Sequence, residues 1–130
     1  MTTSVQRAAM IFGWILIALG ILGFVTSPDG MSPDPDTAAR VFGIFPINII
    51  RSVLHLTLGI WGLASSQWDY SSRQFARVGG VIFVALAIYG IFSPSFAGLF
   101  PIGGNDVWLD GIIGALLAYF GFTAPARATA

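Results

Sequence analysis

The chain has 130 residues, of which 55% are hydrophobic and only 9% are charged, and its mean hydropathy is +0.81. This composition is too apolar for a water-soluble domain of this size and is typical of a chain that lies in a lipid bilayer. The net charge is zero and there is no basic cluster, which argues against nucleic acid as a partner, while the absence of cysteine excludes disulfides and thiolate chemistry.

Four apolar segments follow one another along the chain, at about residues 8–25, 47–64, 78–92 and 107–122. Each approaches the roughly 17 to 25 residues that a helix needs to cross a bilayer. The stretches between them are rich in Ser, Pro, Gly and Asp, which favour turns. The sequence therefore predicts an all-α integral membrane protein, with one domain over residues 1–130 and four transmembrane helices.

The second and fourth segments share one pattern. Residues 43–63 and 98–118 align at a constant offset of 55 without a gap, with Gly, Phe, Pro and Leu at matching positions. The first and third segments align more weakly, at an offset of 70 that places Arg7 on Arg77. We therefore expect two parallel helical hairpins related by a pseudo-twofold axis along the membrane normal. The expected parts are repeat one at about 7–64, repeat two at about 77–122 and a short C-terminal tail at 123–130.

The arginines are unevenly distributed between the two ends of the predicted helices. Those on the side of the chain termini and the middle loop are Arg7, Arg73, Arg77 and Arg127. The first and third loops carry only Arg40, against three aspartates. The positive-inside rule then predicts cytoplasmic N- and C-termini. The acidic, proline-rich stretch 27–36 becomes an external connector.

The second and fourth segments each begin after a Phe-Pro-Ile step. Pro46 and Pro101 are expected to end the preceding extended run, because proline lacks the N–H that a continuing ladder needs. Behind them stand Asn48 and Asn105, whose side chains are expected to cap the first amides of each helix.

Four ionisable residues fall within the aligned stretches 43–63 and 98–118, and the offset of 55 places Arg51 on Asp106 and His55 on Asp110. Charges at membrane depth cost about 2.5 to 3.5 kcal/mol each and are tolerated mainly when they pair or line a wet cavity. We expect an intramembrane polar core in which Arg51 pairs with Asp106 and His55 pairs with Asp110. The alternative for Arg51 is to extend outward to the membrane surface.

His55 also permits two other interpretations. One imidazole could be the single axial ligand of a haem or of a chlorophyll-type pigment, particularly across a dimer. Alternatively, His55 and Asp110 could serve a minimal proton-coupled carrier, although the cytoplasmic halves of the four segments contain no acid or base to continue a proton path. The structural interpretation needs no cofactor and no metal, and it is the one that we favour.

The motifs FPINIIRSVLH (45–55), ARVGG (76–80) and PIGGNDVWLD (101–110) resemble those of domain-of-unknown-function family 4383, a group of small four-helix bacterial membrane proteins. The resemblance covers about residues 7–122 and implies the same fold in a bacterial inner membrane. The family pattern would place a second His where this chain has Asp110, so a role that requires paired histidines is not expected here. No known activity comes with the resemblance.

No enzyme signature accompanies the polar core. The sequence contains no phosphate-binding glycine loop, no metal-ligand spacing and no Ser-His-acid arrangement. We therefore expect a non-catalytic membrane protein, a small accessory or stabilising subunit of a larger complex. Its expected partners are the lipid bilayer and either other membrane protein subunits or a second copy of itself.

Overall fold

The computed structural model describes residues 2–125, and these residues form a bundle of four α-helices. The helices are α1 (Ser4–Thr26), α2 (Ile49–Ser65), α3 (Asp69–Phe92) and α4 (Asn105–Thr123). The first loop contains a small antiparallel hairpin of β1 (Ala39–Val41) and β2 (Phe45–Ile47), and the third contains the short 3₁₀ helix η1 (Phe96–Gly98). The all-α class with four helices is therefore confirmed, whereas the hairpin in the first loop was not foreseen.

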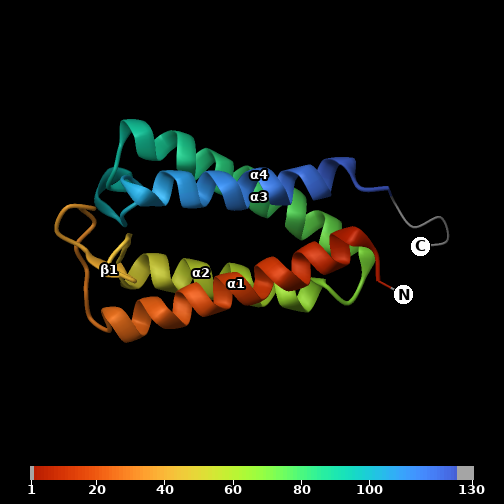
Figure 1. The fold of residues 1–130 in the computed structure, drawn as a ribbon, viewed down its shortest axis with the longest axis horizontal. Coiled ribbons are helices and arrows are strands. Elements are labelled where there is room, and N and C mark those ends of the chain that lie inside the picture. The colour runs from red at the N-terminus through yellow and green to blue at the C-terminus, as the bar shows by residue number, and fades with distance from the viewer. Residues whose placement is uncertain (1, 126–130) are drawn as a thin grey trace.

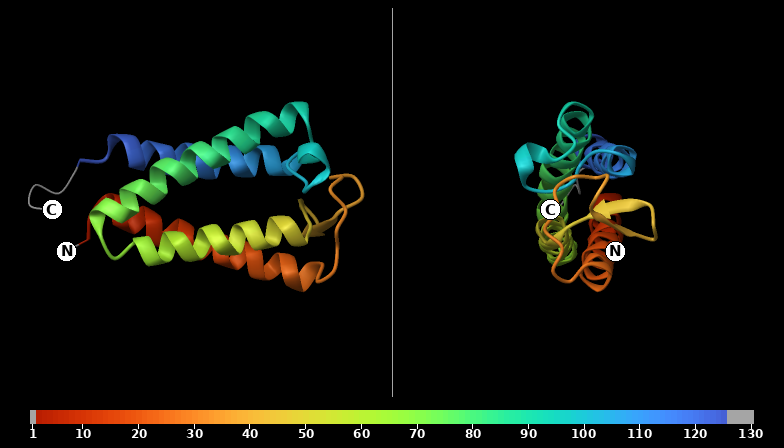
Figure 2. Two further views of the ribbon diagram at one scale, coloured as in Figure 1. Left: turned by 180° about the vertical axis from the view of Figure 1, so that it is seen from behind. Right: turned by 90° about the vertical axis from the view of Figure 1, so that its left-hand side faces the viewer.

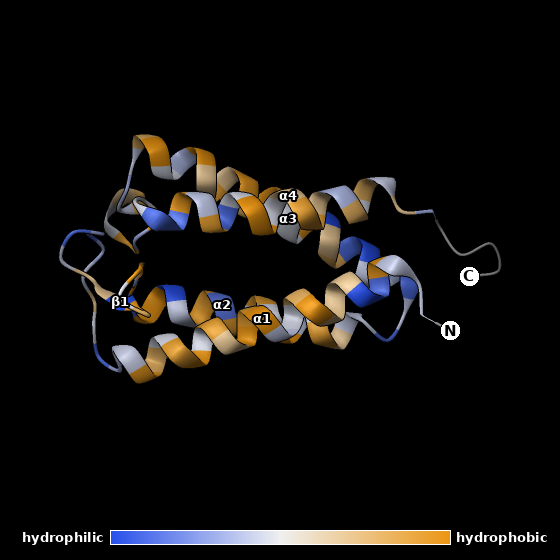
Figure 3. Ribbon diagram, in the orientation of Figure 1, coloured by the Kyte–Doolittle hydropathy of each residue, from blue (hydrophilic) through white to orange (hydrophobic). Residues whose placement is uncertain are grey.

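Three of the four helices, α1, α3 and α4, are long and apolar enough to cross a membrane, which is consistent with a membrane protein. The fourth, α2, is apolar but has only 17 residues. Figure 3 shows apolar residues along all four helices, with hydrophilic residues mainly at the ends of the bundle. The composition and the fold therefore agree on a lipid environment.

The middle loop is much shorter than the sequence suggested. The stretch 65–73 carries turn-forming residues, yet α3 already begins at Asp69. The reason is local: Asp69 lies in the first turn, where the helix dipole favours an acid, and it pairs with Arg73 one turn later at 3.3 Å. The hydroxyl of Ser72 donates to the Trp68 carbonyl, so a polar sequence is accommodated within the helix.

The helices pack as two antiparallel hairpins that form two layers. α1 lies along α2 and α3 lies along α4, and contacts between the two pairs are fewer (Figure 1). The start of α1, the α2–α3 connection and the end of α4 share one end of the bundle, while the β-hairpin and η1 lie at the other (Figure 2). The loops that precede α2 and α4 therefore meet at one end.

Glycines set how closely the helices approach within each hairpin. A Cβ atom added to Gly59 would lie 2.6 Å from the Ile17 backbone nitrogen, and one added to Gly114 would lie 2.5 Å from the Val84 nitrogen. Such close backbone contact stabilises helix pairs in lipid, where hydrophobic force between helices is absent. Gly59 lies against Ile17 and Gly114 lies against Val84, so the residues contacted in the two hairpins are 67 positions apart. The offset of 70 that aligns Arg7 with Arg77 therefore does not describe the packing register.

The interior contains an apolar core that lies beside the polar residues of α2 and α4. Its largest fully buried apolar side chains are Leu16, Phe75, Phe83, Ile102 and Leu117. Because these come from α1, α3, α4 and the loop before α4, the core joins the two hairpins. Arg51 and Asp106 lie in the first turns of α2 and α4, so the polar site is near the end of the bundle that carries the β-hairpin.

Candidate functional site

The segment around Pro46 positions the start of α2. Pro46 is buried in β2 opposite Arg40, and the strand ends one residue later. Asn48 then occupies the N-cap position, and its Oδ1 accepts a hydrogen bond from the Arg51 backbone N–H at 2.9 Å. The predicted cap at Asn48 is thus confirmed. The same amide donates through Nδ2 to the Leu99 carbonyl at 2.9 Å, which ties α2 to the other hairpin.

The predicted cap at Asn105 is wrong. Gly104, with a φ of +61°, occupies the N-cap position and no side chain caps this helix. Asn105 is already helical, so its Nδ2 is free to donate to the Ile44 carbonyl at 3.1 Å, and its Oδ1 accepts from Trp108. Pro101 does precede the helix in a non-helical run, as expected.

Asn48 and Asn105 form a reciprocal pair of links between the hairpins. Each donates to a backbone carbonyl just ahead of the other helix, at Leu99 and Ile44 respectively. These two carbonyls are themselves 55 residues apart. Sequence analysis missed this role, although an Asn within three residues after each Phe-Pro-Ile step was a usable signal.

The guanidinium of Arg51 is the centre of the polar core. Its side chain is fully buried, and Nη2 donates to Asp110 Oδ1 at 2.5 Å. Its Nε lies 3.6 Å from Asp106 Oδ2, which is an ion pair without a hydrogen bond. One guanidinium can serve two carboxylates because it carries five N–H donors in a rigid fork. The predicted Arg51–Asp106 pair is confirmed, and the outward extension of Arg51 is wrong.

The predicted pairing of His55 with Asp110 is also wrong. Asp110 is bound by Arg51, and neither ring nitrogen of His55 has a hydrogen-bond partner within residues 2–125. The His55 ring instead lies beside Phe83 of α3, with centroids 6.3 Å apart and an angle of 26° between the planes. The physical reason is reach: the long arginine side chain can cross from α2 to α4, whereas the short imidazole packs against the nearer α3.

Several polar atoms of the core keep unused bonding capacity among the described residues. They are buried, and they comprise Nε and Nη1 of Arg51, both ring nitrogens of His55, both carboxyl oxygens of Asp106 and Oδ2 of Asp110. The core also has two carboxyl groups for one guanidinium. Such a group of side chains can bind water, a proton or a small polar ligand.

The geometry of the polar core supports a metal ion or a porphyrin less well than it supports an ion-paired link between helices. Within the described part of the chain, no group of three or more His, Cys, Asp or Glu side chains could hold a metal ion. His55 is 2% exposed and has Phe83 beside its ring, so a porphyrin at this position would need the helices to separate. The arrangement is best suited to joining the two hairpins through Arg51.

These observations define a class: a helical bundle with membrane-spanning character, whose two hairpins are joined by a buried arginine between two aspartates. The comparison with protein families agrees with this class, because the model named Domain of unknown function (DUF4383) matches residues 6–123. The chain therefore belongs to this family. No curated protein and no solved structure matches the chain.

Proposed function

We propose that this protein is a non-catalytic, multi-pass membrane protein that serves as a small accessory or stabilising subunit of a larger membrane complex. The observation that carries the proposal is where the charged and the apolar side chains lie. The charged side chains of Arg51, Asp106 and Asp110 pair with one another inside the bundle, whereas large apolar side chains face outward from every helix. The outward residues include Trp14, Ile21, Ile60, Val81, Ile88, Ile112 and Tyr119.

An outward apolar surface can contact lipid or another membrane protein equally well. The polar core supports an internal and structural role, since Arg51 joins α2 to α4 rather than facing an open site. We place all four helices across a bacterial inner membrane, α2 being somewhat short. Both ends of the chain are placed on the cytoplasmic side, since Arg73 and Arg77 lie near that end of α3.

The proposal includes two hairpin repeats related by a pseudo-twofold axis. Support comes from backbone conformation that recurs at an offset of 55: Phe42 and Gly43 have positive φ, and so do Ala97 and Gly98. A left-handed conformation is uncommon for residues such as Phe and Ala, so its recurrence before both Phe-Pro steps is informative. The packing contacts of Gly59 and Gly114 recur in the same way.

The test is extraction of the protein from its native membrane in a mild detergent, followed by separation by size. Stoichiometric co-migration with a larger complex is expected, and the partners are identified by mass spectrometry. A particle with the mass of one or two copies of this chain alone would contradict the accessory role. The visible spectrum of the same particle tests the pigment alternative: a band that His55→Ala abolishes would replace our proposal with cofactor binding.

A proton-coupled carrier is the second candidate, and the unpaired ring nitrogens of His55 favour it. The excess of carboxyl groups over guanidinium in the core adds an acceptor for an exchangeable proton. Its test is proton-driven uptake by protein reconstituted in vesicles, with Asp110→Asn as the inactive variant. Transport by the wild type that Asp110→Asn abolishes would establish the carrier, and no uptake above empty vesicles would exclude it for the solutes assayed.

A further inference from the structure

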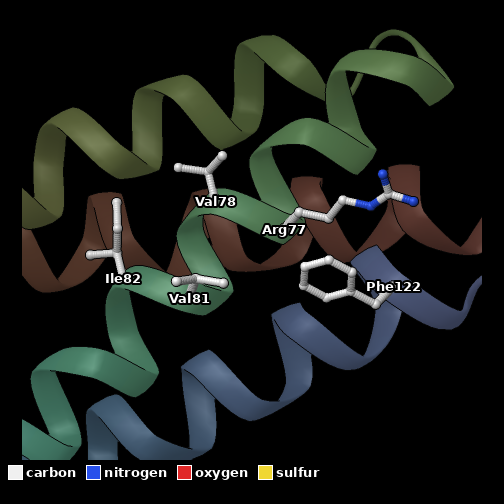
Figure 4. A pocket seen from close by; sticks show the side chains of 5 residues that line it. All are labelled: Arg77, Val78, Val81, Ile82 and Phe122. Carbon is white, nitrogen blue, oxygen red and sulfur yellow. The ribbon is translucent and has the colours of Figure 1, made fainter.

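A shallow groove lies on the outside of the second hairpin, at the end of the bundle that contains the α2–α3 connection. Its volume is about 300 Å³, and Figure 4 shows the side chains that line it. They are Arg77, Val78, Val81 and Ile82 of α3 and Phe122 of α4. The walls are apolar, and the single cationic group among them stands at one end.

The guanidinium of Arg77 is held in place by α4. Its Nε donates to the Gly121 carbonyl at 2.7 Å, and its central carbon lies 5.4 Å from the centre of the Phe122 ring. Its two terminal nitrogens have no hydrogen-bond partner among residues 2–125. Arg77 therefore offers a fixed pair of donors beside Phe122, at one end of the groove and outside its apolar walls (Figure 4).

The neighbouring arginine does not share this property. Arg73, one turn earlier on α3, donates to the Ala124 and Pro125 carbonyls and pairs with Asp69. Its terminal nitrogens are therefore already engaged in closing the bundle end. Of the two described arginines at this end of the second hairpin, Arg77 is therefore the one with terminal nitrogens available to an anion.

We propose that this groove binds one anionic phospholipid, with the phosphate on the terminal nitrogens of Arg77 and one acyl chain along Val78, Val81 and Ile82. A planar guanidinium binds phosphate with two parallel hydrogen bonds, and basic pockets at the cytoplasmic ends of membrane helices bind anionic head groups. The apolar walls formed by Val78, Val81 and Ile82 match an acyl chain, which a soluble anion lacks. The inference rests on the membrane placement proposed above but not on the accessory role.

The experiment uses the full chain in a zwitterionic detergent, titrated with palmitoyl-oleoyl phosphatidylglycerol and followed by native mass spectrometry. One lipid per chain is expected, with about tenfold weaker retention of the matching phosphatidylcholine, because its cationic choline group is repelled by the Arg77 guanidinium while its phosphate is the same. Arg77→Gln is expected to abolish this preference. Arg7→Gln is the matched control, because Arg7 lies at the same end of the bundle, where it donates to Thr2 outside the groove.

A second pair of variants tests the acyl-chain contact without touching a hydrogen bond. Val81→Trp fills the groove and is expected to reduce lipid retention about tenfold. Ile88→Trp, two turns further along α3 and outside the groove, is equally exposed and is expected to retain the lipid. This pair keeps the proposal testable if Arg77→Gln proves unstable.

Three outcomes would overturn the proposal. They are equal retention of the two lipids, unchanged retention in both Arg77→Gln and Val81→Trp, and displacement of the lipid by inorganic phosphate alone, which would show an anion site without an acyl chain. A protein partner that is lost in Val81→Trp while no lipid binds would assign the groove to that partner. Failure of the protein to enter the membrane fraction would instead contradict the membrane placement, so the two failures are distinct.

Discussion

At the scale of the residue, the central fact is that Arg51 forms ion pairs with both aspartates of the polar core, Asp106 and Asp110. Removing Arg51 leaves two buried aspartates without a cation, a change that costs about 3 to 5 kcal/mol for a buried pair, whereas removing either aspartate leaves Arg51 paired with the other. The short Arg51–Asp110 contact and the longer Arg51–Asp106 contact are expected to contribute unequally. Loss of Asp110 should destabilise the bundle more than loss of Asp106.

The pairing can be measured with two double-mutant cycles on the free energy of unfolding in detergent. Arg51→Met combined with Asp110→Leu is expected to show a coupling above about 1 kcal/mol, because the two side chains are hydrogen-bonded. His55→Ala combined with Asp110→Leu serves as the comparison and is expected to be additive within about 0.5 kcal/mol. Equal coupling in the two cycles would show that His55 pairs with Asp110 after all.

At the scale of the element, small residues decide which helices approach and in which register. Gly79 and Gly80 are neighbours in α3, but only Gly80 faces α4 at close range. A Cβ on Gly80 would lie 2.5 Å from the Ala118 backbone nitrogen, whereas one on Gly79 would make ordinary contacts of 3.6 Å or more. The two positions are therefore a matched pair for testing the α3–α4 contact.

Gly80→Ala is expected to lower the free energy of unfolding by about 1 to 3 kcal/mol relative to Gly79→Ala, because the added methyl group meets backbone that cannot move aside. The higher helix propensity of alanine acts in both variants and cancels in the comparison. Thermal unfolding in detergent measures the difference. Equal midpoints for the two variants would contradict the close approach of α3 and α4.

At the scale of the whole molecule, the loops before α2 and α4 lie at the end of the bundle opposite the α2–α3 connection (Figure 2). A protein that crosses the membrane with all four helices must then expose these two ends on opposite sides. Our proposal, based on the arginine distribution, is that the end with the β-hairpin faces the outside.

The chain has no cysteine, so single cysteines can report this orientation directly. Met31→Cys, in the first loop, is expected to react with a membrane-impermeant maleimide in intact cells, and Gln67→Cys, in the α2–α3 connection, only after permeabilisation. Both positions are exposed in the bundle, so access is limited by the membrane rather than by the fold. The opposite labelling pattern would reverse the orientation, and labelling of both in intact cells would contradict the spanning arrangement.

By itself, the sequence determined the all-α class, the four helices to within a few residues at most ends, the cap at Asn48 and the burial of Arg51, His55, Asp106 and Asp110. These follow from local chemistry, since apolar length, proline position and the cost of charge in lipid can be judged without knowing which residues meet. The offset of 55 also predicted that Arg51 pairs with Asp106. Only the tertiary structure decided the remaining partners: Asp110 as the hydrogen-bonded partner of Arg51, Phe83 beside His55, and the reciprocal bonds of Asn48 and Asn105. Partner choice depends on side-chain reach and on the register of helix packing, and a sequence offset shows neither of these.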